Sequence, residues 1–489
     1  MFTIITLLVA TLMLRMAAMI WMTLVPEEAY YWMYWQHPSL SYFDHPPMVA
    51  WLIGLGTQVF GDTEFGVRIG SGLLMLASSG VMYAFSRIWF SREASVVAAL
   101  LLQVLPVYFG TGLIATMDGA LVFFWLITLL GLSVALRRQC AWGWYLAGVG
   151  AGAATLCKYT GVFLVVGSLA TVAGYRPWRR YLITLHPYAA ALLAFAMFTP
   201  VLIWNAQHEW ASFRFQFVGR FEGNGFSMAH VMLFFLLQVA VATPGVLAGL
   251  SWLYVRTLRT RRRSLRPRWL MALSFSLPLL LTTSYRALFY DVHLNWTLPL
   301  YLSTLPAITQ LVLVLCRQMR KRISTVVWRH AALTTGVGCL TLNLVAIVYV
   351  LILQPKAGWV SALGPWRDLA AAVQKVADTQ QTETGHEQLI VGEGKNRLAS
   401  VLAFYRTPLE KDVRASDFTT SQWITDGSEG LAYPYWAKAD KWVDCDIIFV
   451  DGHNVIGSIA SRMGSLQVLG DVRLDHKSYH IAVGRLQRH

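Results

Sequence analysis

The first apolar segment of the sequence is followed by a loop in which acidic and imidazole side chains stand close together. Glu27 and Glu28 come directly after the segment, and Asp44 and His45 precede two consecutive prolines. Carboxylates crowded near a lipid surface repel one another and are poorly solvated unless they meet a cation, a proton or a polar ligand. A proton-abstracting base or a ligand site is therefore the predicted chemistry. The alternative is that the acids only cap helices, where the helix dipole favours them.

Later segments carry basic side chains beside apolar runs. Lys158 lies in LCKYT, Arg220 in WASFRFQFVGRFEG, and Arg286 and Trp296 in SYRALFYDVHLNWTLP. An ionisable group at membrane depth is a functional candidate, although each could instead be an interfacial anchor whose charged end reaches water. Taken together, acids on one loop and cations on three others could hold an anionic substrate at the outer membrane surface.

The composition indicates that lipid surrounds most of the chain. Of the 489 residues 56% are hydrophobic and only 13% are charged, which excludes an ordinary soluble multi-domain enzyme. A membrane-spanning helix needs about 20 mostly apolar residues, and about eleven such segments recur up to residue 353. We predict an all-α polytopic membrane protein with spans at 3–23, 65–86, 94–112, 119–136, 142–157, 160–175, 183–203, 231–255, 269–284, 297–316 and 330–353.

Loop charges orient these spans, because Lys and Arg concentrate in cytoplasmic loops. Runs such as RTLRTRRRSLRPR (256–268) and RQMRKR (317–322) fall on one side, whereas 24–64 contains no Lys or Arg. The N-terminus is thus predicted to be cytoplasmic, and the first loop and everything after 353 to lie outside. Aromatic residues in the first loop predict a short helix in the membrane interface.

The composition changes after the last apolar segment. We predict a transmembrane domain over 1–353 and a small soluble α/β domain over 354–489. Its elements are a helix at 365–378 and strands at 388–392, 446–450 and 479–485. The expected role of this domain is to cover the membrane part rather than to catalyse a reaction.

Several motifs resemble those of a known group. PEEAYYW (26–32) and YFDHPPMVAWL (42–52) resemble the first-loop signature of bacterial GT-C glycosyltransferases of the protein mannosyltransferase superfamily, and in particular lipid A modifying enzymes of the aminoarabinose transferase (ArnT) and rhizobial lipid A galacturonosyltransferase types. LCKYTGVFL (156–164), PVLIWNAQHEWASFRFQ (200–216) and NWTLP (295–299) extend the likeness over roughly residues 20–300.

The resemblance implies an inverting glycosyltransferase in the bacterial inner membrane. Such enzymes move one sugar from a polyprenyl-phosphate donor, not from a nucleotide sugar, to a periplasmic acceptor such as lipid A, lipopolysaccharide or another surface glycan. By this resemblance Glu27 and Glu28 are the catalytic acids. The residues assigned to the donor phosphate are His45, Lys158, Arg220, Arg286 and Trp296.

Two positions depart from the aminoarabinose enzymes. Glu27 replaces their first-loop Asp and is longer by one methylene, and Asp44 with His45 replaces a Glu-Lys pair. A histidine in place of lysine makes a phosphate contact dependent on pH near the ordinary imidazole pKa of about 6.5. Asp44 and His45 could instead hold a divalent cation, since imidazole and carboxylate together suit zinc. No other cofactor is expected.

Two alternatives remain open. A transporter or flippase for a lipid-linked sugar would fit the membrane topology, although the sequence has no clear internal repeat. A protein O-mannosyltransferase would share the first-loop motif and differ only in its acceptor. The product separates these cases: either a sugar reaches an acceptor and polyprenyl phosphate is released, or the intact lipid changes leaflet.

Overall fold

The computed structural model describes most of the chain. The described residues are 2–218, 225–259, 266–290, 294–319, 338, 341–345, 364–409, 415–427, 429–436, 442, 445–453, 466–474 and 477–485. Within them the chain is mainly helical and has a small sheet near its C-terminal end. This agrees with the predicted architecture.

Internal contacts divide the chain into two compact units. The helix unit comprises Met1–Ala18, His45–Val49 and Ser71–Ala346, and the cap unit comprises Met19–Asp44, Ala50–Gly70 and Ile347–His489. The cap unit therefore groups the first loop with the C-terminal domain, which the sequence did not reveal. The predicted domain boundary at residues 353 and 354 lies outside the described residues and stays a prediction.

The predicted apolar segments up to residue 316 coincide with helices. These helices are α1 (Phe2–Trp21), α4 (Glu64–Trp89), α5 (Arg92–Val104), α6 (Pro106–Leu113), α7 (Met117–Arg137), α8 (Trp142–Cys157), α9 (Val162–Gly174), α10 (Leu185–Gln207), α12 (Met228–Arg259), α13 (Arg266–Ala287) and α14 (Leu298–Met319). The segment at 94–112 is split in two, because Pro106 cannot continue α5 but suits the first position of α6. The segment at 231–255 is bent at Thr243, just before Pro244.

Shorter elements complete the fold. The first loop contains α2 (Pro26–Gln36) and α3 (Met48–Phe60). The remaining short helices are α11 (Ala211–Phe217), α18 (Trp423–Asp426), α19 (Tyr433–Trp436), η1 (Tyr159–Gly161), η2 (Arg176–Ile183), η4 (Leu294–Thr297) and η5 (Ala415–Phe418).

Several helices meet the requirements for crossing a bilayer. In the described part of the chain four are long and apolar enough to do so alone, and up to seven spans result if each of three bent helix pairs counts as one. The predicted span at 330–353 lies largely outside the described residues. The number of eleven spans therefore stays a prediction.

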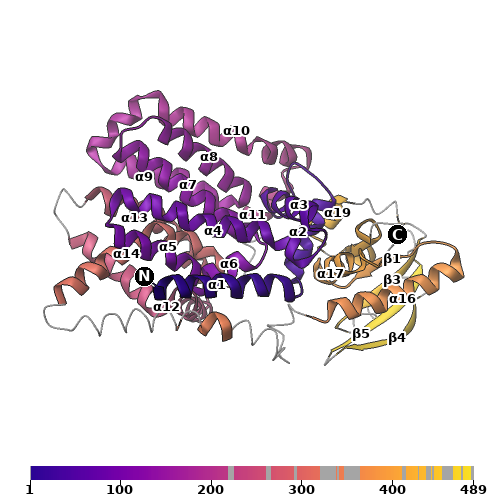
Figure 1. Ribbon diagram of the computed structural model, residues 1–489. Helices are drawn as coiled ribbons and strands as arrows, with labels where there is room; N and C mark the ends of the chain where they lie inside the picture. The colour runs from indigo at the N-terminus through magenta and orange to yellow at the C-terminus, as the bar shows by residue number, and fades with distance from the viewer. Residues whose placement is uncertain are drawn as a thin grey trace. The chain divides into compact units, whose positions relative to one another are not determined.

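Helices α7, α8 and α10 run side by side in the helix unit (Figure 1). Two glycines allow α7 and α8 to approach closely. A Cβ on Gly131 would lie 2.5 Å from the backbone nitrogen of Ala147, and one on Gly143 would lie 2.5 Å from that of Ala135. Small residues at such contacts let membrane helices pack backbone against backbone.

The C-terminal domain is built on a five-stranded sheet of order β2-β1-β3-β5-β4. The strands are β1 (Leu389–Gly392), β2 (Thr419–Ser421), β3 (Asp446–Asp451), β4 (Leu466–Leu474) and β5 (Lys477–Arg485). β1 and β2 run parallel to β3, and β5 is antiparallel to both β3 and β4. The helices α16 (Trp366–Thr384) and α17 (Arg397–Arg406) pack against each other in the same domain (Figure 1).

The elements of this domain follow from its apolar runs. β1 and β3 are short and almost entirely buried, and Leu389, Val391, Ile447 and Phe449 share a core with Trp442. Such runs are typical of strands covered on both faces. The predicted helix and three strands are confirmed. β2 and β4 were not predicted.

The close contact between α7 and α8 can be tested by adding one methyl group. Gly131→Ala should lower the free energy of unfolding by about 1–3 kcal/mol, because the new Cβ meets backbone that cannot move aside. Gly80→Ala in α4 is the control, since its Cβ meets nothing within 4 Å. Thermal unfolding of the purified proteins measures both. Equal unfolding temperatures for the two variants would contradict this packing.

Candidate functional site

A pocket of about 480 Å³ lies within the helix unit, and its walls are largely apolar. It is lined by side chains from the turn between α8 and α9, from α11, from α13 and from the segment before α14. Four of the five residues predicted to contact a donor phosphate line it, namely His45, Lys158, Arg286 and Trp296. The fifth, Arg220, lies outside the described residues. Segments far apart in the sequence thus bring cationic side chains to one apolar pocket.

Lys158 is held at the end of α8, where the backbone becomes extended before η1. Its ammonium lies 3.0 Å from Oδ1 of Asp118 in the first turn of α7, and both side chains are largely buried. Asn295 donates a hydrogen bond of 2.6 Å to the other oxygen, Oδ2. Both oxygens of Asp118 are therefore engaged, which fixes the position of the lysine.

Arg286 lies in the last turn of α13 and stacks on aromatic rings. Its guanidinium carbon is 4.7 Å from the ring centroid of Trp296 and 5.0 Å from that of Tyr290. Stacking fixes the plane of a guanidinium while its N–H donors point outward in that plane. Such an arrangement suits binding of a phosphate or carboxylate through two parallel hydrogen bonds.

The charges and walls of this pocket define what it can bind. Among the described residues that line it, Lys158 and Arg286 are cationic and His45 can become so, and Asp118 forms an ion pair with Lys158. Aliphatic and aromatic side chains such as Val162, Phe163 and Leu279 form much of the remaining wall. An anionic group attached to an apolar chain matches both features.

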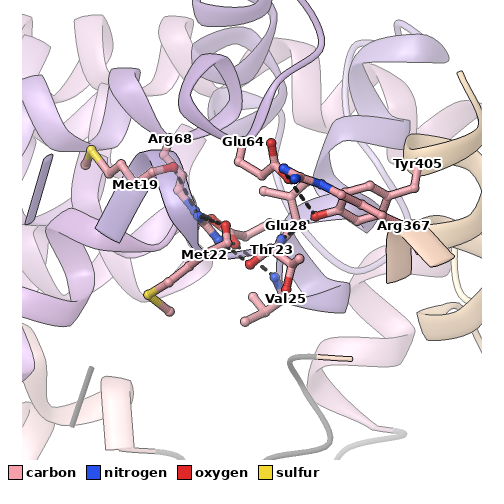
Figure 2. A network of polar contacts seen from close by, with 10 residues as sticks. Met19, Met22, Thr23, Val25, Glu28, Glu64, Arg68, Arg367 and Tyr405 are labelled. Carbon is pink, nitrogen blue, oxygen red and sulfur yellow. Dashed lines mark hydrogen bonds and ion pairs between the residues drawn. The ribbon is translucent and has the colours of Figure 1, made fainter. Parts of the chain in front are cut away.

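The predicted acids belong to the cap unit, and Glu28 is enclosed there. Its carboxylate forms a fully buried ion pair with Arg68 of α4, with contacts of 2.8 and 2.6 Å to Nε and Nη2, and accepts a bond of 3.0 Å from the backbone nitrogen of Val25. Arg68 also donates to the carbonyl oxygens of Met22 and Thr23 (Figure 2). Arg68 therefore holds the turn between α1 and α2, and the geometry favours a structural role for Glu28.

A second polar cluster joins the first loop to the C-terminal domain within the cap unit (Figure 2). Glu64, at the start of α4, accepts bonds of 2.5 Å from Arg367 and 3.1 Å from the Tyr405 hydroxyl. The same hydroxyl accepts a bond of 2.7 Å from the backbone nitrogen of Leu24. Burial and the Glu64 carboxylate raise the pKa of Tyr405, so this tyrosine remains a donor. The hydrogen bond that Arg367 donates to Glu64 likewise raises the pKa of Arg367.

Glu27 differs from Glu28 in its surroundings. Its side chain is partly exposed, and Oε1 lies 2.9 Å from Nη2 of Arg397, the first residue of α17. The two acids are adjacent in α2 and therefore point to different sides of the helix. Glu27 thus keeps access to solvent, and a cation from the C-terminal domain accompanies it.

Asp44 is buried among the tyrosines of α2. Its Oδ1 accepts a bond of 2.8 Å from the Tyr30 hydroxyl and another from the Tyr34 hydroxyl. In the described part of the chain no group of three or more His, Cys, Asp or Glu side chains is placed to hold a metal ion. The predicted pair of Asp44 and His45 therefore has no third His, Cys, Asp or Glu ligand among these residues.

Sequence reasoning missed the partners of the predicted residues. Asp118 stands at the start of an apolar span at the predicted outer level, which is a signal that could have been used. Arg68 lies inside the predicted span 65–86, where an ionisable side chain is itself a signal. Arg397 carries no local signal, because it meets Glu27 only through the tertiary fold.

Comparison with known proteins identifies relatives. Residues 44–204 match the family described as dolichyl-phosphate-mannose-protein mannosyltransferase. The lipid A galacturonosyltransferase RgtD of Rhizobium johnstonii is 26% identical over 57% of this chain and 58% of its own length. An undecaprenyl phosphate-alpha-4-amino-4-deoxy-L-arabinose arabinosyl transferase of Pseudomonas fluorescens is 26% identical over 67% of this chain and 56% of its own length. The chain therefore spans a little over half the length of these two relatives.

A solved structure shares the fold. ArnT from Cupriavidus metallidurans bound to undecaprenyl phosphate matches with a TM-score of 0.63 and 17% identity, covering 98% of this chain and 97% of that one. At this identity the likeness concerns the fold. Together with the relatives, it confirms the resemblance that the motifs of the first loop predicted.

The different surroundings of the two adjacent acids predict different effects of the same substitution. Glu28→Gln should lower the free energy of unfolding by about 3–5 kcal/mol, because it leaves the buried charge of Arg68 without its partner. Glu27→Gln should change stability by no more than about 1 kcal/mol, since its ion pair is solvated. Thermal unfolding in detergent compares the two. A Glu28→Gln variant as stable as the wild-type protein would contradict a structural role for this residue.

Proposed function

We propose that this chain, a relative of the GT-C glycosyltransferases of the protein mannosyltransferase superfamily, transfers one sugar from a polyprenyl-phosphate donor to a periplasmic acceptor. The observation that carries the proposal is the apolar pocket in which Lys158 and Arg286 converge with His45 and Trp296, which we call the donor pocket. A polyprenyl phosphate has the anionic group and the apolar chain that such a pocket suits. The similarity of the chain to a lipid A galacturonosyltransferase supports lipid A or another surface glycan as the acceptor.

The proposed reaction is a single displacement at the anomeric carbon. An acceptor hydroxyl oxygen attacks this carbon as its bond to the phosphate oxygen breaks, so the configuration inverts. Polyprenyl phosphate leaves with the bonding electrons, and Lys158 and Arg286 stabilise its negative charge. The carboxylate of Glu27 takes the proton of the attacking hydroxyl, as the base of an inverting glycosidase does for water.

The roles of the remaining predicted residues follow from their contacts. Glu28 positions Glu27, because its ion pair with Arg68 fixes the start of α2. Asp44 orders the same helix through Tyr30 and Tyr34, and His45, the next residue, lines the donor pocket. We propose Arg220 as a further phosphate contact on the basis of the sequence motif alone.

The proposed setting is the bacterial inner membrane. About eleven spans place the N-terminus in the cytoplasm, and the first loop and the C-terminal domain in the periplasm. The absence of Lys and Arg from residues 24–64 supports this orientation. The transmembrane domain then covers 1–353 and the periplasmic domain 354–489. A donor pocket at the outer membrane surface would receive its lipid from the surrounding leaflet.

The identity of the base is tested with Glu27→Gln. The purified variant should lose transfer by at least about 100-fold, the usual contribution of a general base, while it still binds polyprenyl phosphate. Glu383→Gln, on the exposed face of α16, is the matched control and should keep full activity. Mass spectrometry of the acceptor and of released polyprenyl phosphate measures turnover.

Near-normal turnover in Glu27→Gln would remove this residue from the mechanism. Movement of intact donor between leaflets without transfer would instead identify a flippase.

The donor pocket is tested by removing its cations one at a time. Lys158→Gln and Arg286→Gln should each raise the Kd for polyprenyl phosphate by roughly 30-fold, which corresponds to about 2 kcal/mol for a lost buried charge contact. Lys375→Gln on α16 is the control. Arg220→Gln is expected to behave like the two pocket variants. Unchanged donor affinity would mean that these residues are interfacial anchors.

A further inference from the structure

A second pocket, with polar walls, lies within the cap unit. It has a volume of about 490 Å³ and is lined by the end of α2, by α3 with the turn that follows it, and by Thr407 and Ser416, two residues that come after α17. We call it the cap pocket. Its volume falls in the range of about 300–1,000 Å³ that is typical of sites for small ligands. None of the residues predicted from the sequence to act on the donor lines it.

The chemistry of the cap pocket differs from that of the donor pocket. Its polar side chains are two amides, one carboxylate and three hydroxyls, contributed by Gln36, Gln58, Asp62, Thr57, Thr407 and Ser416. Among the described residues that line it there is no Lys or Arg, in contrast to the pocket that contains Lys158 and Arg286. The hydroxyls of Thr57 and Thr407 donate to the carbonyl oxygens of Gly54 and Ala403 and can still accept a hydrogen bond, whereas the two amides can both donate and accept. They match a ligand whose own groups do the same, as the hydroxyls of a sugar do.

Two side chains of the cap pocket are held in fixed orientations. The Trp35 ring packs on Gly54, where a Cβ would lie 2.2 Å from the ring, so only glycine admits the ring at this place. Oδ1 of Asp62 accepts a bond of 2.6 Å from the indole nitrogen of Trp32. A fixed carboxylate can accept bonds from two neighbouring hydroxyls, and a fixed indole offers an apolar surface to the C–H face of a sugar ring.

The position of the cap pocket along α2 relates it to the proposed base. Glu27 lies in the first turn of this helix and Trp35 near its end. Eight residues of α-helix at 1.5 Å each separate them by about 12 Å along the axis. A sugar in the cap pocket is therefore too far from Glu27 to carry the reacting hydroxyl itself. It would be a neighbouring sugar of the same acceptor glycan.

We infer that the cap pocket binds a sugar of the acceptor, at least one sugar away from the hydroxyl that reacts. This inference rests on the proposed glycosyl transfer and names the acceptor as a glycan with more than one sugar. The C-terminal domain then takes part in acceptor selection, because Thr407 and Ser416 come from it. Gln58 and Asp62 are the side chains on which the selection most depends.

Direct binding tests the inference without relying on transfer. The full-length protein is purified in an amine-oxide detergent, because maltoside detergents carry a competing sugar. Isothermal titration with maltotriose, chitotriose and mannotriose should show saturable binding of at least one trisaccharide. Gln58→Ala and Asp62→Asn should weaken it by about five-fold each, as for the loss of one hydrogen bond. Gln380→Ala and Asp378→Asn on exposed α16 are the matched controls and should bind as wild type does.

Kinetics then separate this inference from the proposed function. With a multi-sugar acceptor, Gln58→Ala should raise the acceptor KM and leave kcat and the donor KM unchanged. If trisaccharides bind in a way that depends on Gln58 but no sugar is transferred, the proposed function is contradicted. The cap pocket would still be supported as a sugar site. Normal transfer with no trisaccharide binding, or binding only of a serine-rich peptide, would overturn the cap pocket as a sugar site. Equal loss of binding in the α16 controls would overturn it as well.

Discussion

The ion pair between Glu28 and Arg68 is the interaction on which the arrangement of the first loop depends. Both side chains are fully buried, and the arginine also binds carbonyl oxygens at the end of α1. The chain turns sharply there, because the helix pair Leu8–Trp21 and Pro26–Gln36 is bent by 70° at the break between them. A buried pair of this kind requires both partners, because either charge alone would be left without solvation. The turn, the direction of α2 and the position of Glu27 follow from it.

The donor pocket contains a second buried ion pair. Lys158 is accompanied by Asp118, whose other oxygen is bound by Asn295, so the position of the lysine is fixed. Arg286 lies over the rings of Tyr290 and Trp296, whose faces attract a cation. Because both cations are held in place before the reaction, they would stabilise the leaving phosphate without rearrangement of the protein.

Sequence patterns predicted the parts of this protein that follow local rules. Apolar length located the helices, and short apolar runs located β1, β3 and β5. The edge strand β2 is buried but consists of Thr and Ser, and the edge strand β4 is largely exposed, so neither has a buried apolar run. Residue type and loop position singled out Glu27, Lys158 and Arg286. The sequence could not predict which acidic side chain pairs with which basic one. Arg68, Asp118 and Arg397 are distant in sequence from their partners, so Glu28 could not be distinguished from Glu27 before the fold was known.

We propose that the acid at the start of α2 and the cations of the donor pocket serve one reaction. A cryo-EM structure of the full chain with bound undecaprenyl phosphate would locate the phosphate relative to these side chains. We expect the phosphate within hydrogen-bonding distance of Lys158 and Arg286, and the Glu27 carboxylate facing the same cavity with room for a sugar between them. A phosphate bound elsewhere, or Glu27 directed into the lipid headgroups with no cavity beside it, would contradict the account.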